Sequence, residues 1–260
     1  MTTTLVTAFF DIDREMRGDG RSISTYLEWI QKTLLLHCHL YVVTETKFAP
    51  FFKEHRPADY PMKIKLISFQ ESEYYSYYDR IQDILQQTTY REKVAFPNRV
   101  ECQLPEYTIL QFSKFHYLRM AIDENPFQSE FFLWIDAGSS RFFNSLSLST
   151  YFPKKTFSFQ KNLFYIQCRS DLFQYPLDPY RFIWTADNLM YGGMFGGHFE
   201  IVLVIASKVK HIFEWMLSQS NVNNEQLALA LVWKDSPDLF WVIDRPHVPI
   251  YLLDIFSQTI

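Results

Sequence analysis

An unbroken apolar run at residues 131–135, Phe-Phe-Leu-Trp-Ile, is followed at once by Asp136 and then by Ala, Gly and Ser. A run without a polar position predicts a strand buried on both faces, as in a parallel sheet covered by helices. A carboxylate at the carboxyl end of such a strand lies where open α/β sheets bind ligands, and small neighbours let a phosphate or a metal approach the backbone. We therefore favour a ligand site at Asp136 over the common alternative, an aspartate that only starts a turn.

The first part of the chain alternates between strand-like and helix-like patterns. Strands are predicted at residues 5–10, 40–43 and 64–69. The helix predicted between the first two has apolar side chains at helical spacing, namely Tyr26, Leu27, Ile30 and Leu34. This order is the beginning of a Rossmann-like α/β unit.

A helix is predicted over residues 107–124, because Phe112, Phe115 and Leu118 recur at three- and four-residue steps and form one apolar face. Lys114 falls at the edge of this face. Either it is a snorkelling lysine whose stem covers the core, or its ammonium is a cation held near the sheet edge next to Asp136, where phosphates would lie. Both interpretations stay open from the sequence.

The next segments predict two strands, at residues 157–159 and 163–166, that pair antiparallel. Residues 184–202 then hold four of the seven glycines in the protein, as two pairs: Gly192, Gly193, Gly196 and Gly197. Scarce glycine concentrated in this way indicates tight backbone geometry or close approach of a ligand. A bulged hairpin that needs positive φ is the alternative. The spacing matches neither the dinucleotide fingerprint nor the P-loop.

The last part of the chain predicts two helices and a strand. Ser207 is expected to cap the first helix, and a capping box of Asn223 and Gln226 to open the second, with Glu225 in its first turn. A strand follows at residues 240–244. The proline-bracketed loop after it contains Asp244 and His247; a lone histidine is usually structural, but a rigid loop after a strand is a good place for a ligand.

Composition excludes several classes of protein. A net charge of −4 with mixed signs provides neither a basic field for nucleic acid nor a polybasic membrane patch. The aromatic share of 18% is high, and we interpret it as a phenylalanine-rich core. Neighbours on a strand point to opposite faces, so the run His37, Cys38 and His39 is expected to be structural and not a metal cluster.

The cellular location is inferred from cysteine usage and from the absence of targeting patterns. Three cysteines, far apart and without a CxxC pair, indicate a reducing compartment. The amino-terminal apolar run has no basic region before it and ends at Asp11, so no signal peptide is predicted. No apolar segment is long enough for a transmembrane span. We expect a cytoplasmic protein.

Several segments together resemble the HtrL/YibB (WlaTC-like) bacterial family. They are TLVTAFFDI, KFHYLRMAIDENPF, FLWIDAGSSRF and the paired-glycine segment. The likeness runs from about residue 4 to residue 200 and more weakly beyond, and W-x-D-A-G-x-S-R preceded by S-K-F-x-Y-L is its more specific part. Members of this family look like GT-A glycosyltransferases and are often encoded among surface-polysaccharide genes.

The resemblance implies a fold and a function. The fold is a single GT-A-like (Rossmann-like) α/β domain over residues 1–260, with a mixed, mainly parallel central sheet flanked by helices. Residues 1–136 would form the nucleotide-binding half and residues 137–260 the acceptor-side half. The function is a metal-assisted glycosyltransferase, moving a sugar from a nucleotide-sugar donor to a saccharide acceptor in surface-glycan synthesis.

The resemblance also implies a divalent metal, Mn or Mg. The GT-A fold usually carries Asp-x-Asp at the end of a central strand, where two carboxylates hold the metal and the donor diphosphate. Here Asp136 matches the first carboxylate, but Gly138 stands at the second position. Oxygen and imidazole ligands suit these metals, so His247 is the candidate for the missing partner of Asp136.

Roles for other residues follow from the same resemblance. Glu225 matches an acidic residue near an acceptor-side helix start and would act as general base if the enzyme inverts, with Asp187 as its rival. Retention would require no such base. Lys114 or Arg141 would neutralise the departing diphosphate together with the metal. The donor-binding residues are expected to be Thr7, Phe9, Lys114, Asp136, Gly138 and Arg141, and the acceptor-binding residues Gly192 and Gly193.

Two other functions remain as alternatives. A catalytically degenerate module on the same fold would bind a nucleotide sugar or glycan without turnover, and Gly138 in place of a carboxylate favours it. A nucleotidyltransferase or sugar-nucleotide hydrolase would use a similar sheet edge. Nucleotidyltransferases usually have a glycine-rich phosphate loop after the first strand, and none follows residues 5–10.

Overall fold

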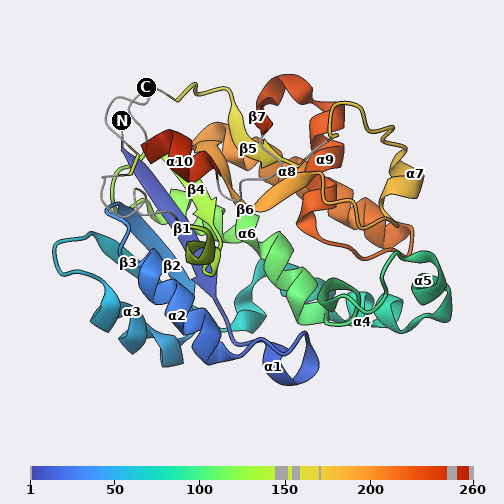
Figure 1. The fold of residues 1–260 in the computed structure, drawn as a ribbon, viewed down its shortest axis with the longest axis horizontal. Coiled ribbons are helices and arrows are strands. Elements are labelled where there is room, and N and C mark those ends of the chain that lie inside the picture. The colour runs from blue at the N-terminus through green and yellow to red at the C-terminus, as the bar shows by residue number, and fades with distance from the viewer. Residues whose placement is uncertain (1, 144–151, 154–158, 170, 245–250, 258–260) are drawn as a thin grey trace.

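The computed structural model describes residues 2–143, 152–153, 159–169, 171–244 and 251–257 (Figure 1). In this part of the chain a seven-stranded sheet has the order β3-β2-β1-β4-β6-β5-β7. The strands are β1 Thr3–Phe9, β2 His39–Thr44, β3 Met62–Leu66, β4 Phe131–Ile135, β5 Phe164–Cys168, β6 Met190–His198 and β7 Phe240–Asp244.

The sheet is mixed and mainly parallel. Strands β3, β2, β1 and β4 pair parallel, and β5 pairs parallel with β7. Strand β6 runs antiparallel to both of its neighbours, β4 and β5. The predicted fold class, a mixed and mainly parallel α/β sheet flanked by helices, is therefore confirmed.

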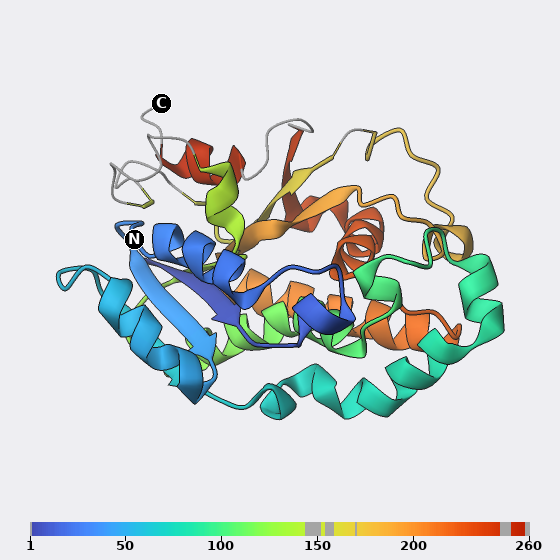
Figure 2. The same cartoon turned by 60° about the horizontal axis from the view of Figure 1, so that its bottom comes forward.

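Helices cover both faces of this sheet (Figure 2). The α-helices are α1 Arg14–Arg17, α2 Ile23–Thr33, α3 Ala49–His55, α4 Tyr78–Gln86, α5 Thr88–Lys93, α6 Pro105–Glu124, α7 Pro179–Phe182, α8 Phe199–Ser218, α9 Glu225–Asp235 and α10 Tyr251–Ser257. Short 3-10 helices are η1 Thr46–Phe48, η2 Phe69–Glu71, η3 Glu73–Tyr77, η4 Val100–Cys102, η5 Ser139–Phe142 and η6 Pro237–Leu239.

The core has two layers, one on each face of the sheet. Helices α6, α8 and α9 bury their apolar side chains with one set of strand residues, which includes Val6, Phe132 and Trp134. Helices α2, α3 and α10 pack on the alternate residues, such as Leu5, Leu133 and Ile135. Both faces of β1 and β4 are therefore buried, which is why residues 131–135 carry no polar position.

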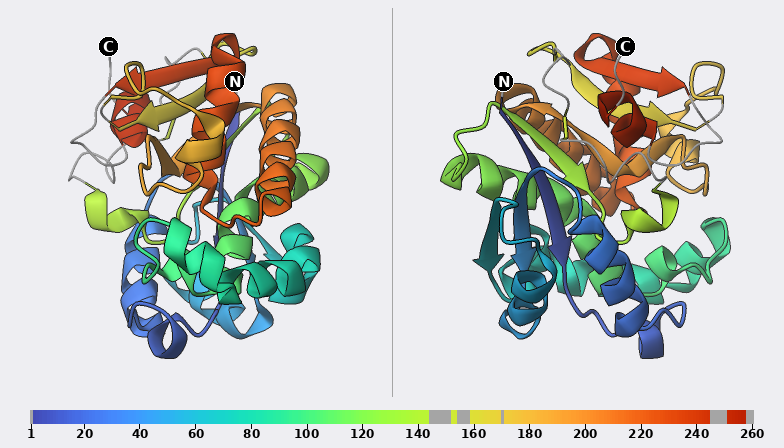
Figure 3. Two further views of the ribbon diagram at one scale, coloured as in Figure 1. Left: turned by 90° about the vertical axis from the view of Figure 1, so that its right-hand side faces the viewer. Right: turned by 60° about the vertical axis from the view of Figure 1, so that its left-hand side comes forward.

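Residues 73–102 contain η3, α4, α5 and η4. Helix α4 packs against α6 (Figure 3). Its buried residues Ile81, Ile84 and Leu85 belong to the core on that face of the sheet. Among the described helices, none combines the length and the apolar character needed to cross a lipid bilayer.

Two predicted helix starts are wrong. Ser207 does not cap a helix, because α8 begins directly after β6 with His198 as its N-cap, and its apolar positions extend back to Ile201 and Val202. The predicted capping box of Asn223 and Gln226 is also wrong. The N-cap is Asn224, whose side chain accepts from the backbone N–H of Gln226, while Asn223 Oδ1 accepts from the N–H of Asn224.

The predicted strands differ from the structure in two further places. The third strand spans Met62–Leu66 and ends before the predicted residues 67–69. Residues 157 and 158 lie outside the described residues, so the strand predicted there and its antiparallel pairing with residues 163–166 are not described. The strands at residues 131–135 and 240–244 are confirmed.

The paired-glycine segment forms β6 between β4 and β5. A Cβ at Gly196 would lie 2.2 Å from the carbonyl oxygen of Phe132, and one at Gly197 would lie 2.7 Å from that of Leu163. Real Cβ atoms do not approach backbone so closely, so these two glycines let neighbouring strands meet. The other pair, Gly192 and Gly193, lies toward the opposite end of β6.

Candidate functional site

A pocket of about 710 Å³ opens at the carboxyl ends of β1 and β4. It is lined by Ala8–Arg14, at the end of β1 and directly after it, and by Asp136–Ser139, which follow β4. The chain leaves β1 toward β2 on one side and later returns to β4 on the other side, so the direction of sheet growth reverses between β1 and β4. Ligands of open α/β sheets bind at such a switch point, and the volume suits a small-molecule ligand.

The structure brings most of the predicted site residues together in this pocket. The lining includes Phe9, Lys114, Asp136, Gly138, Arg141, Gly192, Gly193 and Glu225. Thr7 and Asp187 are not among the described residues that line it: the Thr7 side chain is buried inside β1, and Asp187 is exposed and accepts a hydrogen bond from the Tyr175 hydroxyl. His247 lies outside the described residues.

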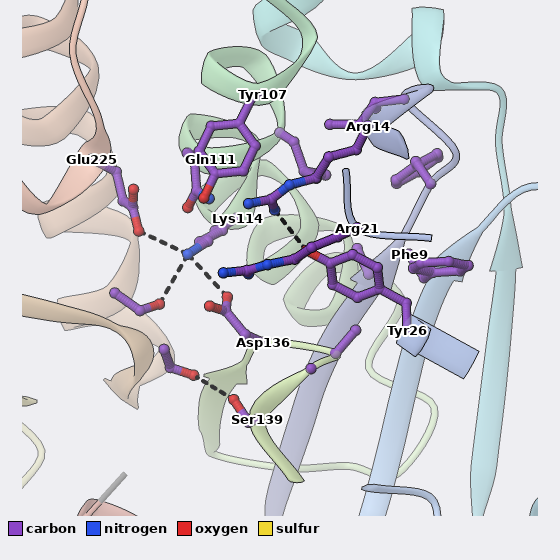
Figure 4. Close-up of a pocket in the computed structure, with 18 of the residues that line it drawn as sticks. Phe9, Arg14, Arg21, Tyr26, Tyr107, Gln111, Lys114, Asp136, Ser139 and Glu225 are labelled. Carbon is purple, nitrogen blue, oxygen red and sulfur yellow. Dashed lines mark hydrogen bonds and ion pairs between the residues drawn. The ribbon is translucent and has the colours of Figure 1, made fainter. Parts of the chain in front are cut away.

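Three side chains, Lys114, Asp136 and Glu225, form an ionic cluster in the inner wall of the pocket (Figure 4). The Lys114 Nζ lies 2.9 Å from Asp136 Oδ1 and 2.7 Å from Glu225 Oε1. It also donates to the Gly192 carbonyl oxygen at 2.9 Å. An ammonium has three hydrogens, so these contacts use all of them.

The cluster is buried, and burial decides its protonation. The side chains of Lys114 and Glu225 are 3% and 0% exposed. Burial alone would lower the pKa of Lys114, but the negative charges of Asp136 and Glu225 outweigh it and raise the pKa above its ordinary value. Lys114 is therefore a fixed cation. Complete burial raises the pKa of Glu225, although Lys114 opposes this shift.

The carboxylate of Asp136 is held in one orientation. The Trp134 indole Nε1 donates to Asp136 Oδ1 at 2.7 Å, and the Asp136 backbone N–H donates to the Gly193 carbonyl oxygen at 2.9 Å. Residues two apart on a strand share a face, so the sequence W-x-D itself places the indole beside the carboxylate. The Asp136 side chain is 40% exposed, so it remains accessible from the pocket.

Gly192 is required by Glu225. A Cβ at Gly192 would lie 1.9 Å from Glu225 Oε1 and 3.1 Å from the Gln226 Cγ. At Gly193 the nearest atom to such a Cβ is 3.9 Å away, so the space there is open to the pocket. One glycine of the pair thus makes room for a buried carboxylate, and the other leaves room beside Asp136.

The opposite side of the pocket carries arginines and aromatic rings that the sequence analysis missed. Arg14 forms a bidentate ion pair with Asp19 at 2.6 and 2.7 Å and donates to the Tyr26 hydroxyl at 2.6 Å. The Arg14 guanidinium lies 4.6 Å from the Tyr107 ring centroid. Arg21 approaches the same Asp19 at 3.3 Å. The loop of residues 17–20, Arg-Gly-Asp-Gly, therefore binds the pocket arginines through Asp19.

One signal for the missed residues was present in the sequence. Tyr107, Gln111 and Lys114 follow at steps of four and three, so they lie on one face of α6, and all three line the pocket. The apolar repeat of α6 predicts only which face meets the core, so it does not distinguish this polar stripe from an ordinary solvent-exposed face. Arg21 had no comparable signal, since it lies in an irregular segment before α2.

The described residues do not fit a divalent metal. They contain no group of three or more His, Cys, Asp or Glu side chains that could hold one. Asp136 and Glu225, the nearest pair of carboxylates, already share the Lys114 ammonium. A Cβ at position 138 would lie 3.0 Å from the Trp29 ring, so a second carboxylate there would require this ring to shift. The Mn or Mg expected from the resemblance stays a prediction.

The fold and this pocket define a mixed α/β protein with a ligand site at the switch point of its sheet. The chain belongs to the HtrL_YibB family, described as a bacterial protein of unknown function, whose model matches residues 1–253. The resemblance found in the sequence is therefore confirmed.

Solved structures and curated proteins were also compared with the chain. The apo form of mouse xyloside xylosyltransferase 1 is similar over 99% of this chain and 94% of that chain, with 11% sequence identity and a TM-score of 0.43. None of the curated proteins matches this sequence.

Proposed function

We propose that this protein is a glycosyltransferase that moves a sugar from a nucleotide-sugar donor to a saccharide acceptor in surface-glycan synthesis. The observation that carries the proposal is the switch-point pocket, because it gathers the predicted donor residues Asp136 and Arg141 with the predicted acceptor-side residues Gly192 and Glu225. Residues 1–136 would supply the nucleotide side and residues 137–260 the acceptor side. The cytoplasmic location stays a prediction from cysteine usage.

The reaction would use the carboxylates and cations of the pocket in separate roles. The bond between the sugar C1 and the donor phosphate oxygen breaks, and its electron pair leaves with the diphosphate. The acceptor hydroxyl oxygen bonds to C1 and gives up its proton. Cations near the leaving group stabilise the charge that develops there. Arg141 is better placed for this than Lys114, whose three hydrogens already have acceptors.

Glu225 is the better supported of the two candidate bases. It lines the pocket, whereas Asp187 is exposed and is not among the described lining residues. Its raised pKa brings the carboxyl closer to the operating pH, which favours proton transfer from a hydroxyl. Its Oε2 atom is buried without a hydrogen-bond partner in the described part of the chain, so it has unused capacity to accept a hydrogen bond.

The test is a transfer assay that measures release of the nucleoside diphosphate from a panel of nucleotide sugars and acceptor saccharides, with manganese, with magnesium and with EDTA. Glu225→Gln should retain donor binding and lose transfer. Asp136→Asn should lose donor binding or turnover while its stability stays within about 1–2 kcal/mol of wild type. Glu54→Gln, an exposed change on α3 outside the pocket, is the control and should be fully active.

A second candidate function is the degenerate binding module. The observation in its favour is that Lys114 already forms an ion pair with both carboxylates of the inner wall. This function predicts nucleotide-sugar or glycan binding without turnover under any metal condition. Donor binding in a protein that transfers no sugar to any acceptor, and that is unaffected by Glu225→Gln, would support it over the transferase.

A further inference from the structure

The ammonium of Lys114 lies among oxygens in the way a bound cation would. Asp136 Oδ1, Glu225 Oε1 and the Gly192 carbonyl oxygen all lie within 2.9 Å of its Nζ. Two of these oxygens are carboxylate oxygens, the ligands that Mn and Mg prefer. A metal ion at this place would have to compete with the Lys114 ammonium, which is part of the protein and cannot dissociate from it.

The other side of the pocket has positive charge with fewer partners. Arg21 lies just before α2 and its side chain is 41% exposed; Arg141 lies on η5, directly after the β4 turn. Within the described residues Arg141 has no ion pair, and its guanidinium lies 4.9 Å from the Trp29 ring and 4.7 Å from the Phe142 ring. Arg21 has one carboxylate contact there, with the Asp19 that Arg14 binds on both oxygens.

The two arginines lie in or just before elements that pack against each other. The Ser140 hydroxyl donates to the Trp29 carbonyl oxygen at 2.6 Å, and the Thr33 hydroxyl donates to the Ala137 carbonyl oxygen at 3.2 Å. These bonds fasten η5 to α2, so the position of Arg141 is fixed relative to the start of α2, where Arg21 lies. Figure 4 shows Arg21 extending toward Lys114 and Asp136.

The arginines also repel one another. Partial burial and the neighbouring charge of Arg21 lower the pKa of Arg141. Two like charges facing one pocket are stabilised when an anion binds between them, and guanidinium groups bind phosphate oxygens in a bidentate manner. Asp13 and Glu15 also line the pocket, so its lining carries charges of both signs.

We infer that Arg21 and Arg141 bind the diphosphate group of the ligand, and that this binding needs no divalent cation because the Lys114 ammonium already supplies the positive charge between Asp136 and Glu225. The inference rests on the proposed function only in taking the diphosphate to belong to a nucleotide sugar. Lys114 is then a positioning residue that holds Asp136 and Glu225, and the two arginines are the ligand-binding cations.

Calorimetric titration with uridine diphosphate, guanosine diphosphate and inorganic pyrophosphate tests this inference, each in EDTA and in manganese. At least one nucleoside diphosphate should bind equally well in both. Arg21→Gln and Arg141→Gln should each weaken that binding about tenfold or more, as expected for loss of a charge-assisted hydrogen bond. Arg181→Gln on α7, whose side chain is 90% exposed, is the control and should bind like wild type.

Three results would overturn the inference: binding that EDTA abolishes and manganese restores, arginine variants that fold and bind like wild type, or no binding of any diphosphate in either condition. Pyrophosphate that binds as tightly as the nucleotides would support the diphosphate site but count against a nucleotide-sugar donor. Sugar transfer that strictly requires manganese would leave the proposed function standing without the inference. Diphosphate binding without metal, in a protein that transfers no sugar, would support the inference and contradict the proposed function.

Discussion

The two sides of the pocket hold their positive charges in different ways. On the inner wall, Lys114 is 3% exposed and all its hydrogens have oxygen acceptors from the protein. On the rim, formed by Arg21 and Arg141, the guanidinium groups are partly exposed and lie beside aromatic rings or a shared carboxylate. A basic side chain near a predicted ligand site is therefore not necessarily a ligand-binding residue. It can bind a ligand only if some of its hydrogens are not already bonded to acceptors in the protein.

The energetic consequences of the two arrangements should also differ. Breaking a buried ion pair leaves an uncompensated charge in a medium that solvates it poorly. An exposed pair is screened by water, and its loss costs little. Removal of the buried Lys114 ammonium should therefore alter stability, whereas changes on the rim should mainly alter binding.

The largest expected effect is that of Lys114→Met. It removes the cation shared by Asp136 and Glu225, so we expect a loss of about 3–5 kcal/mol in the free energy of unfolding, measured by urea denaturation. Lys161→Met is the matched control, because its ion pair with Glu130 is exposed, and it should cost no more than about 1 kcal/mol. Equal denaturation midpoints for the two variants would show that the wall cluster contributes no special stability.

A smaller effect is expected at the glycine pair. Gly192→Ala places a Cβ where Glu225 Oε1 now lies, so the helix start of α9 or strand β6 must shift, at a cost of about 1–3 kcal/mol. Gly193→Ala, on the neighbouring residue of the same strand, meets nothing nearer than 3.9 Å and should be close to wild type. The comparison is made by thermal unfolding. Two alanine variants of equal stability would mean that Glu225 has another place to pack.

The smallest effect is expected on the rim side, at Asp19. Burial would raise the pKa of this carboxyl, but its hydrogen bonds and ion pairs with Arg14 outweigh burial and lower it below 3.8. The folded state therefore favours the carboxylate, and this stability is present above pH 3.8 and is lost as pH falls through the lowered pKa. Asp19→Asn should cost less than about 1 kcal/mol at neutral pH.

The pH dependence provides the check for Asp19. Stability curves of wild type and Asp19→Asn, measured by urea denaturation across the acid range, should converge as pH falls below 3.8. A difference that stays constant over this range would assign the effect of the substitution to packing and not to charge.

The sequence predicted what local patterns determine. The apolar run before Asp136 predicted β4, because a strand buried on both faces has consecutive apolar residues. The helical repeat after Tyr107 predicted α6, because a helix buried on one face has apolar residues every three or four positions. The prediction of a cap at Ser207 is wrong because the apolar repeat of α8 continues before this residue, at Ile201 and Val202. Local patterns of this kind predict the presence of a helix or strand more reliably than they predict where it begins and ends.

The pairing inside the site could not be predicted in the same way. Lys114 and Glu225 are 111 residues apart, and Lys114 and Gly192 are 78 residues apart, so only the folded sheet brings them together. The need for glycine at position 192 is likewise a consequence of a distant carboxylate. The sequence did indicate Lys114 as a cation near Asp136, but it gave no means of knowing that its hydrogens are already used.

The most direct test of the division between wall and rim is a crystal structure of the protein with a nucleoside diphosphate and manganese, with anomalous scattering used to locate the metal. The account predicts a diphosphate between Arg21 and Arg141, with Lys114 still bonded to Asp136 and Glu225 and no anomalous peak beside Asp136. A manganese peak joining Asp136 to the diphosphate, with Lys114 displaced from the carboxylates, would contradict it.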